Sequence, residues 1–147
     1  MVSKGWLYNN KQVLNIADMP SDTIGFVYKI TDANGKMYIG RKSIFSKRKR
    51  HFGKKEAALL KDKRLKKWEY VTTETNWLTY TGSCKPLNAA IKKGLSVKKE
   101  ILKFCSNSKQ LTFYEWKFQF CNDVIESNNH LYWNENICGK FFPEDLK

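Results

Sequence analysis

The stretch GFVYKITDANGKMYIG, residues 25–40, constrains the fold more than any other part of the chain. Two runs rich in β-branched and aromatic residues, 25–31 and 36–41, lie on either side of the turn signal DANG. This arrangement is typical of a β-hairpin. Each run carries one tyrosine, Tyr28 or Tyr38. The hairpin therefore raises the question of whether these two aromatic side chains only fill a core or bring two hydroxyl groups together.

The length of the hairpin loop decides where the two tyrosines lie. Side chains alternate between the faces of a strand, and cross-strand partners share a face. A two-residue loop would place Tyr28 and Tyr38 on opposite faces. A three-residue loop at 33–35 would pair Tyr28 with Gly40 and bring both hydroxyls to one face. A type I turn followed by a left-handed glycine gives the longer loop. Because Gly35 stands where that glycine is needed, we predict the three-residue loop.

The pattern along the rest of the chain, taken together with the hairpin, predicts a single α+β domain. Its small three-stranded antiparallel sheet is flanked by helices. We expect an N-terminal extension over residues 1–23, with a small hairpin turning at Asn9 and Asn10, and the domain proper over residues 24–147. No repeat or Pro- or Ser-rich linker divides the chain. The expected further elements are helical structure over 46–67 interrupted at Gly53, a helix capped by Ser83 and ended by Gly94, a third strand over 97–104, and a C-terminal helix that starts at Ser108.

The C-terminal helix carries a carboxylate in an unexpected place. Apolar residues at 111, 114, 118, 121 and 125 have the spacing of one buried helix face. Glu115 falls within that stripe. An unpaired charge facing a core costs several kcal/mol. Glu115 therefore needs a basic partner, a hydrogen-bonded network or a metal ion, and a structural ion pair is the simplest of these.

The positive charge is concentrated in one segment. The net charge is +13, and residues 41–67 contain 13 basic residues against only Glu56 and Asp62. Such a dense segment indicates a polyanionic partner, although a solvated helix face is the alternative. A membrane surface fits less well because no apolar face accompanies the charges. The residues that we expect to bind nucleic acid are Arg41, Lys42, Lys47, Arg48, Lys49, Arg50, Lys54 and Lys55.

The cysteines and the hydropathy pattern exclude several classes of protein. The four cysteines, at 84, 105, 121 and 138, form no C-x-x-C pair, so a zinc site has little support. We expect them to be small core residues in a reducing compartment. No apolar run is long enough to span a membrane, and no signal peptide is visible. These features predict a soluble, cytoplasmic protein.

The motifs together resemble the GIY-YIG nuclease family. The segment FVY stands for its first element and YIG for its second, with nine residues between Tyr28 and Tyr38. Arg48 lies eight residues after Gly40, and Glu115 stands on a later helix, as the family pattern requires. YWNENICG offers Asn134 and Asn136 for the asparagine near the C-terminus. The longer run, about 24–142, is most similar to phage-encoded Seg-type endonucleases. If this chain is also phage-encoded, its expected location is the cytoplasm of the bacterial host.

This chain departs from the family pattern at two points. The first motif reads Phe-Val-Tyr instead of Gly-Ile-Tyr, but it keeps the tyrosine. His51 follows Arg48 by three residues instead of four, so either the helix register differs or Lys47 and Arg48 compete for the arginine role.

The resemblance implies a mechanism in which one Mg²⁺ ion, replaceable by Mn²⁺, is held by Glu115. The scarcity of carboxylates in residues 25–52 agrees with a single ion. Tyr28 would act as general base, with Tyr38 assisting. An unperturbed tyrosine is only about 0.1% ionised at pH 7, so Lys42, Arg48 or the metal would have to lower its pKa. Arg48 would also clamp the phosphate. His51 would contact a phosphate or assist proton transfer, and Asn134 would complete the site.

The leading hypothesis is therefore a DNA endonuclease that cuts double-stranded DNA. A homodimer, or sequential nicking, would let a single site per chain cut both strands. The alternative is a non-catalytic nucleic-acid-binding protein on the same scaffold. A third class, a protein that mimics DNA, fits poorly because such mimics are expected to be acidic. Strong salt dependence of binding is expected for enzyme and binder alike.

Overall fold

The computed structural model describes residues 5–127 and 130–147. It contains seven strands, three α-helices and two short 3-10 helices within the described residues. In chain order the elements are β1 (Trp6–Tyr8), β2 (Lys11–Val13), η1 (Ile16–Asp18), β3 (Gly25–Asp32), β4 (Met37–Ser43), β5 (Phe45–His51), α1 (Lys54–Ala58), β6 (Trp68–Glu74), α2 (Lys85–Lys92), β7 (Val97–Cys105), α3 (Ser108–Cys121) and η2 (Pro143–Leu146).

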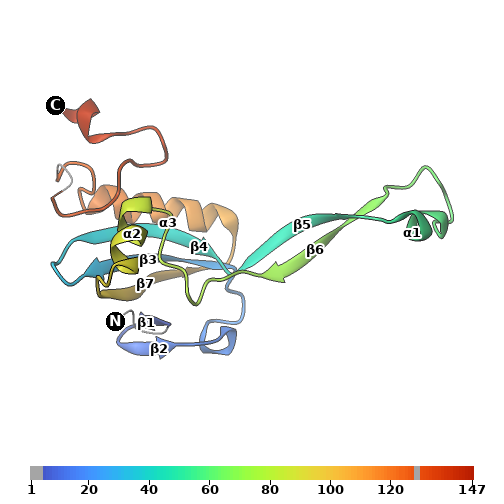
Figure 1. Cartoon of the computed structure of the whole chain (residues 1–147), viewed down its shortest axis with the longest axis horizontal. Helices are drawn as coiled ribbons and strands as arrows, with labels where there is room; N and C mark the ends of the chain where they lie inside the picture. The colour runs from blue at the N-terminus through green and yellow to red at the C-terminus, as the bar shows by residue number, and fades with distance from the viewer. Residues whose placement is uncertain (1–4, 128–129) are drawn as a thin grey trace.

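The main sheet has five strands in the order β2-β1-β7-β3-β4, so the expected count of three strands was too low (Figure 1). The predicted N-terminal hairpin exists and turns at Asn9 and Asn10, which both have positive φ. The two extra strands belong to this hairpin. Strand β1 joins the sheet through a parallel pairing of Leu7 with Glu100 on β7. Residues 6–13 are thus part of the sheet.

The hairpin of β3 and β4 has the predicted three-residue loop. Tyr28 pairs with Gly40, and Ile30 pairs with Tyr38. The amide of Gly35 donates to the carbonyl of Asp32 at 3.0 Å, and Gly35 has φ of +86°. Glycine adopts this left-handed conformation without steric cost. The two tyrosines consequently lie on the same face, with ring centroids 6.2 Å apart.

The prediction of helical structure over residues 46–67 is wrong for most of that segment. Residues 45–51 and 68–74 instead form the antiparallel pair β5–β6, and only Lys54–Ala58 is helical. The reason lies in the partner strand: β6 reads WEYVTTE, which is rich in the aromatic and β-branched residues that favour strands. We call residues 45–74 the arm. It projects away from the main sheet, as Figure 1 shows on the right.

Two hydrophobic clusters cover the two faces of the main sheet. One contains Phe26, Tyr28, Ile30 and Leu87 of α2. The other contains Val27, Ile39 and Leu111 of α3, together with residues that follow α3. Alternation along β3 thus sends Tyr28 to the α2 side of the sheet and Val27 to the α3 side. Helix α3 covers the second face, and the strand β4 forms one edge of the sheet.

The helix ends differ slightly from the sequence expectation. Cys84, not Ser83, precedes α2, and Asn107 caps α3 by accepting a hydrogen bond from the amide of Gln110 at 2.9 Å. Gly94 ends the α2 segment with φ of +110°, as expected.

The cysteines are divided between core and surface. Cys84 and Cys105 are buried, whereas Cys121 and Cys138 are exposed, so the expectation that all four lie in the core was wrong. For Cys121 the physical reason is that the buried face of α3 runs through Leu111 and Gln119, and position 121 lies outside it. Among residues 5–127 and 130–147, no helix is long and apolar enough to cross a membrane.

Candidate functional site

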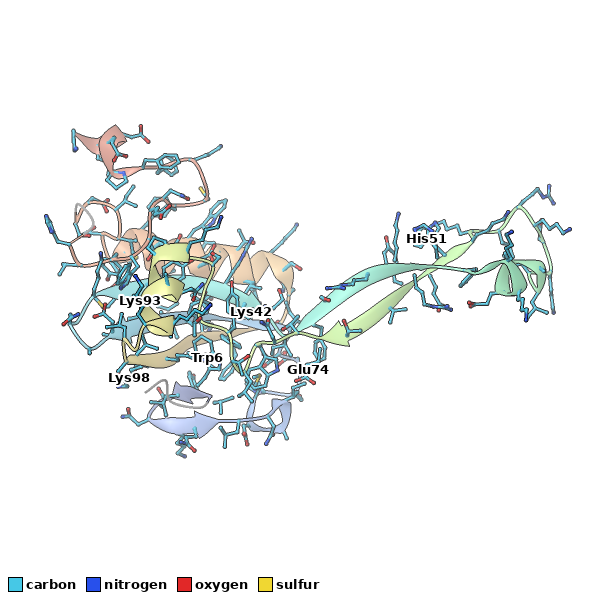
Figure 2. All side chains as sticks on the ribbon, viewed as in Figure 1. Trp6, Lys42, His51, Glu74, Lys93 and Lys98 are labelled. Carbon is cyan, nitrogen blue, oxygen red and sulfur yellow. The ribbon has the colours of Figure 1, made fainter. Side chains whose placement is uncertain are left out.

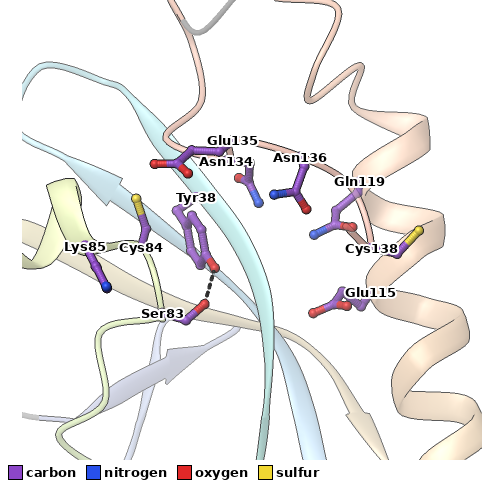
Figure 3. A pocket seen from close by; sticks show the side chains of 10 residues that line it. All are labelled: Tyr38, Ser83, Cys84, Lys85, Glu115, Gln119, Asn134, Glu135, Asn136 and Cys138. Carbon is purple, nitrogen blue, oxygen red and sulfur yellow. Dashed lines mark hydrogen bonds between the residues drawn. The ribbon is translucent and has the colours of Figure 1, made fainter. Parts of the chain in front are cut away.

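A polar pocket of about 470 Å³ lies at the edge strand β4. One wall comes from β4 and the start of α2, a second from α3, and a third from the chain after Tyr132. Figure 3 shows Tyr38 and Ser83 on one side of the strand and Glu115 and Gln119 on the other. The residues that line it are Tyr38, Ser83, Cys84, Lys85, Glu115, Gln119, Asn134, Glu135, Asn136 and Cys138. The pocket therefore brings together residues from three distant parts of the chain.

Two glycines make room for the tyrosine pair. A Cβ atom on Gly40 would lie 2.6 Å from the Tyr28 hydroxyl and 3.0 Å from Cε1 of Tyr38. A Cβ atom on Gly82 would lie 2.9 Å from the same Cε1 atom, and Gly82 also has φ of +88°. The distances of 2.6 Å and 2.9 Å are too short for a real Cβ atom, so neither glycine can be replaced without moving a tyrosine ring. The last residue of YIG and the glycine of YTGS thus have a steric role in seating the tyrosines.

The two tyrosine hydroxyls differ in access. Tyr28 is 1% exposed and packs in the core, whereas Tyr38 is partly exposed and lines the pocket. The Tyr38 hydroxyl is hydrogen-bonded to Oγ of Ser83 at 3.1 Å (dashed in Figure 3). The hydroxyl that faces the pocket directly therefore belongs to Tyr38, and Tyr28 lies behind it.

The electrostatic environment keeps both tyrosines protonated. Burial raises the pKa of Tyr28 well above its ordinary value of 10.0, and the neighbouring Tyr38 and Tyr80 raise it further. Burial likewise raises the pKa of Tyr38, although the hydrogen bond from Ser83 partly offsets this. Glu115 adds a smaller upward contribution to both. The expectation that nearby cations lower the pKa of Tyr28 is thus not met by the protein's own residues.

A third tyrosine belongs to the cluster. The ring of Tyr80 meets that of Tyr28 edge to face, with centroids 6.1 Å apart. The ammonium group of Lys42 stands 4.1 Å above the Tyr80 ring. Burial lowers the pKa of Lys42, so this cation is partly withdrawn from water. Lys42 therefore contacts Tyr80, which in turn packs against Tyr28.

Glu115 lies on α3 and has a basic neighbour. Its Oε1 atom is 3.8 Å from Nε of Arg41, which also donates a hydrogen bond to Oγ1 of Thr112. Burial raises the pKa of Glu115, and Arg41 partly offsets the increase. The basic partner expected for Glu115 is thus Arg41. Arg41 itself extends from β4, one residue after the YIG motif.

Gln119, one helical turn after Glu115, supplies an oxygen atom without a partner. Its amide nitrogen donates to the carbonyl of Ile39 at 3.0 Å, which fixes the orientation of the side chain. The other end, Oε1, has no hydrogen-bond partner in the described part of the chain, although Gln119 is only 5% exposed. Buried polar atoms are rarely left in this state. A carboxylate and an amide oxygen on one helix face are ligands that Mg²⁺ accepts.

The protein's own side chains provide only some of the ligands that a hard cation such as Mg²⁺ needs. No cluster of three or more His, Cys, Asp or Glu side chains occurs in residues 5–127 and 130–147. A Mg²⁺ ion at Glu115 would therefore have to take its remaining ligands from water and phosphate oxygens, as this ion commonly does.

The two candidate asparagines have different roles. The side-chain amide of Asn134 is 4% exposed and spans the backbone of Ile39, accepting from its N–H at 3.0 Å and donating to its carbonyl at 2.8 Å. It thereby pairs with the edge strand as a neighbouring strand would. Asn136 is more exposed and accepts a hydrogen bond from the amide of Gly139 at 2.8 Å. Asn134 is therefore a positioning residue for strand β4.

Several predicted site residues lie on the arm instead of at the pocket. Arg48 was expected on a helix, but it is exposed on β5, where it pairs with Val71. His51 ends the same strand, opposite Trp68. The other arm residues among those expected to bind nucleic acid are Lys47, Lys49, Arg50, Lys54 and Lys55. None of these residues lines the pocket. The predicted position of Arg48 assumes a helix after Gly40, whereas the structure has strand β5 there, and Arg48 lies outside the pocket.

Sequence reasoning missed Ser83, Gln119 and the proximity of Arg41 to Glu115. A signal existed for Gln119, since it follows Glu115 by four residues and a helix places such pairs together. Ser83 and Arg41 could not be placed from the sequence, because their contacts depend on how α2 and α3 dock on the sheet.

One family model matches nearly the whole chain. The model is described as "Putative endonuclease segE, GIY-YIG domain", and it matches residues 6–137. No curated protein matches the chain, and no solved structure does.

Proposed function

The chain belongs to the GIY-YIG family of nuclease domains, and from this premise we propose that it is a metal-dependent endonuclease that hydrolyses the phosphodiester bonds of double-stranded DNA. The observation that carries the proposal is the pocket at β4. It places the YIG tyrosine on one side of the strand and the partly buried carboxylate of Glu115 on the other. An apolar core would disfavour this carboxylate, so a role outside the core explains its position.

In this proposal Glu115 holds one Mg²⁺ ion, and Oε1 of Gln119 is the nearby oxygen available to support it. When bound, such an ion neutralises charge on the phosphate and favours ionisation of water. Arg41 contributes the guanidinium group that the sequence pattern assigned to Arg48. It is the arginine that lies beside Glu115, and its planar group can bind two phosphate oxygens.

The tyrosine pair accepts the proton of the attacking water. Tyr38 faces the pocket and orients the water, and Tyr28 remains the proposed general base behind it. Because burial raises the pKa of both hydroxyls, the base is almost fully protonated at neutral pH in the free protein. The cleavage rate should therefore rise with pH across the neutral range, where only the small ionised fraction is active.

Incubation of the purified protein with supercoiled plasmid and Mg²⁺ tests the proposed function. We expect nicked or linear plasmid with Mg²⁺ or Mn²⁺ and none with EDTA. A protein that retards the plasmid on a gel but leaves it uncut with both ions would contradict the proposal. In that case the chain would be a nucleic-acid-binding protein on a nuclease scaffold.

Replacing Tyr28 by phenylalanine should lower the rate constant of cleavage by about 10²-fold or more, the usual contribution of a general base. The change removes one hydroxyl and leaves the ring packing intact. Single-turnover cleavage rates should be compared with those of Tyr132→Phe, since Tyr132 is also buried but lies in the other hydrophobic cluster. Tyr132→Phe should cleave at nearly the wild-type rate. Equal rates for Tyr28→Phe and the wild type would remove Tyr28 from the mechanism.

A further inference from the structure

The arm, residues 45–74, is built without a core of its own. No residue from 45 to 76 is buried. Figure 1 shows that β5 and β6 leave the body together and extend beyond it, with α1 at the far end. An isolated two-stranded ribbon is at best marginally stable in water. An arm of this kind has surface on both faces that the rest of the described chain does not cover.

The arm carries an excess of unpaired positive charge. It contains eleven Lys and Arg residues and four Asp and Glu residues. Three of the four carboxylates are already paired: Glu56 and Glu69 both bind Arg50, and Asp62 binds Arg64. The other nine basic residues of the arm form no ion pair with any residue in the described ranges. Figure 2 shows the side chains around His51 standing out from the ribbon on both sides.

One face of the arm combines lysines with aromatic rings. Strand alternation and the β5–β6 register place the following residues on this basic-aromatic face: Phe45, Lys47, Lys49, His51, Trp68, Tyr70, Thr72 and, at the end next to the body, Glu74. The ammonium group of Lys47 lies 4.4 Å above the Tyr70 ring, and that of Lys49 lies 4.3 Å above the Trp68 ring. The two rings meet edge to face, with centroids 4.9 Å apart. The face therefore offers cations and flat apolar surfaces side by side.

The opposite face is different in character. Arg50 on that face donates to both Glu56 and Glu69, with distances of 2.8 Å and 2.7 Å for the two ion pairs. Ser46 and Thr73 are hydrogen-bonded across the strands at 3.3 Å. This face satisfies much of its polar capacity internally. On the basic-aromatic face, Lys47 and Lys49 contact aromatic rings and pair with no carboxylate of the described residues.

We infer that the arm is a groove-binding ribbon that enters the major groove of duplex DNA with its basic-aromatic face directed at the DNA. The inference rests on the proposed function and adds to it the part of the substrate that is bound away from the pocket. Lys47 and Lys49 would leave their aromatic rings for backbone phosphates. Tyr70 and Thr72, near the middle of β6, would face the base edges.

The dimensions of the arm favour the major groove. The major groove is about 12 Å wide and admits a two-stranded ribbon, whereas the minor groove of about 6 Å does not. Two paired strands are about 4.8 Å apart, so their side chains would fill the rest of the groove width. A strand of seven residues, such as β5, spans about 23 Å. This length allows contact with phosphates on both sides of the groove. A membrane surface is disfavoured because neither face of the arm is apolar.

Binding should be measured separately from cleavage. The full-length Glu115→Gln protein in EDTA buffer and a short fluorescent duplex of mixed sequence allow anisotropy titrations without hydrolysis. In this background, Lys47→Gln with Lys49→Gln should weaken duplex binding by about tenfold to a hundredfold and should lower the salt slope by about 2. The matched control is Lys92→Gln with Lys93→Gln, which removes the same charge from the exposed end of the α2 segment. The control should bind almost as the parent does.

A second pair of variants tests the aromatic residues without changing charge. Trp68→Ala with Tyr70→Ala should also weaken binding, while leaving the salt slope of the parent. Thermal unfolding of each variant, compared with the parent, confirms that the body of the protein is intact. Because the arm contributes no buried residue, the midpoint should change little.

Chemical footprinting with dimethyl sulfate identifies the groove, because this reagent methylates N7 of guanine in the major groove and N3 of adenine in the minor groove. We expect protection of guanine N7 by the parent and loss of that protection in the Lys47/Lys49 variant. The inference is overturned by protection of adenine N3 alone, by stronger binding to the single strand than to the duplex, or by equal binding of the arm variants and the Lys92/Lys93 control. Because these titrations involve no cleavage, arm binding by a protein that fails to cut plasmid would reject the nuclease proposal and retain the groove-binding ribbon.

Discussion

Replacing Glu115 by glutamine should reduce plasmid cleavage by about 10²–10³-fold, the effect of losing one group that stabilises transition-state charge. Glutamine has nearly the same shape, so the packing of α3 on the sheet is preserved. The change removes the negative charge that would hold a divalent cation and leaves Arg41 without its ionic neighbour. The loss should appear in the single-turnover rate at saturating Mg²⁺, with DNA affinity in EDTA almost unchanged.

Glu135→Gln is the matched control for this prediction. Glu135 also lines the pocket but is exposed, and it forms no ion pair within the described residues. Its replacement should leave the cleavage rate close to that of the wild type. If the two variants cleave equally well, the carboxylate in the pocket has no special role and Glu115 is only a partner of Arg41.

The pH dependence of stability distinguishes Glu115→Gln from the wild type as well. Burial raises the pKa of Glu115 above its ordinary value of 4.5. The folded state therefore binds the proton more tightly than the unfolded state, and stability falls as pH rises from 4.5 through the raised folded pKa. Glu115→Gln lacks this penalty. Its free energy of unfolding relative to the wild type should increase over that pH window and then become constant, as urea titrations at several pH values would show.

Replacing Asn134 by aspartate should destabilise the fold at neutral pH by roughly 3 kcal/mol or more, the effect of leaving a buried charge without compensation. The amide nitrogen of Asn134 donates to the carbonyl of Ile39. An ionised carboxylate would place an oxygen against that carbonyl at a site that is 4% exposed. Urea unfolding followed by circular dichroism measures the loss. Protonation restores a donor, so the loss should shrink as pH falls.

Asn136→Asp provides the comparison, because the Asn136 side chain only accepts a hydrogen bond, from Gly139, and a carboxylate can do the same. This variant should unfold at nearly the wild-type urea concentration. A similar loss in both variants would mean that charge in the C-terminal segment, and not the pairing of Asn134 with Ile39, sets the stability.

The parts of the site that follow from local rules could be predicted from the sequence. The register that brings Tyr28 and Tyr38 together depends on a loop of three residues, 33–35, whose last residue is Gly35. The unusual position of Glu115 follows from helical periodicity within one element. In the first case the contacts lie within a few residues of the chain, and in the second they lie within one regular helix.

The parts that depend on distant partners could not be predicted. Residues 45–51 contain four consecutive basic residues and have no clear period, so their strand conformation depends on pairing with Trp68–Glu74. Arg48 was misplaced for that reason. The five-stranded sheet requires Leu7 to pair in parallel with Glu100, and no local signal joins two residues so far apart. The proximity of Arg41 to Glu115 likewise follows from the docking of α3.

The pairing of Asn134 with strand β4 also determines when during synthesis the pocket can be completed. The ribosome makes Tyr28, Tyr38 and Glu115 first, but the edge of β4 stays open until the segment around Asn134 emerges and closes it. Shorter chains, such as those released by early termination, lack the third wall of the pocket.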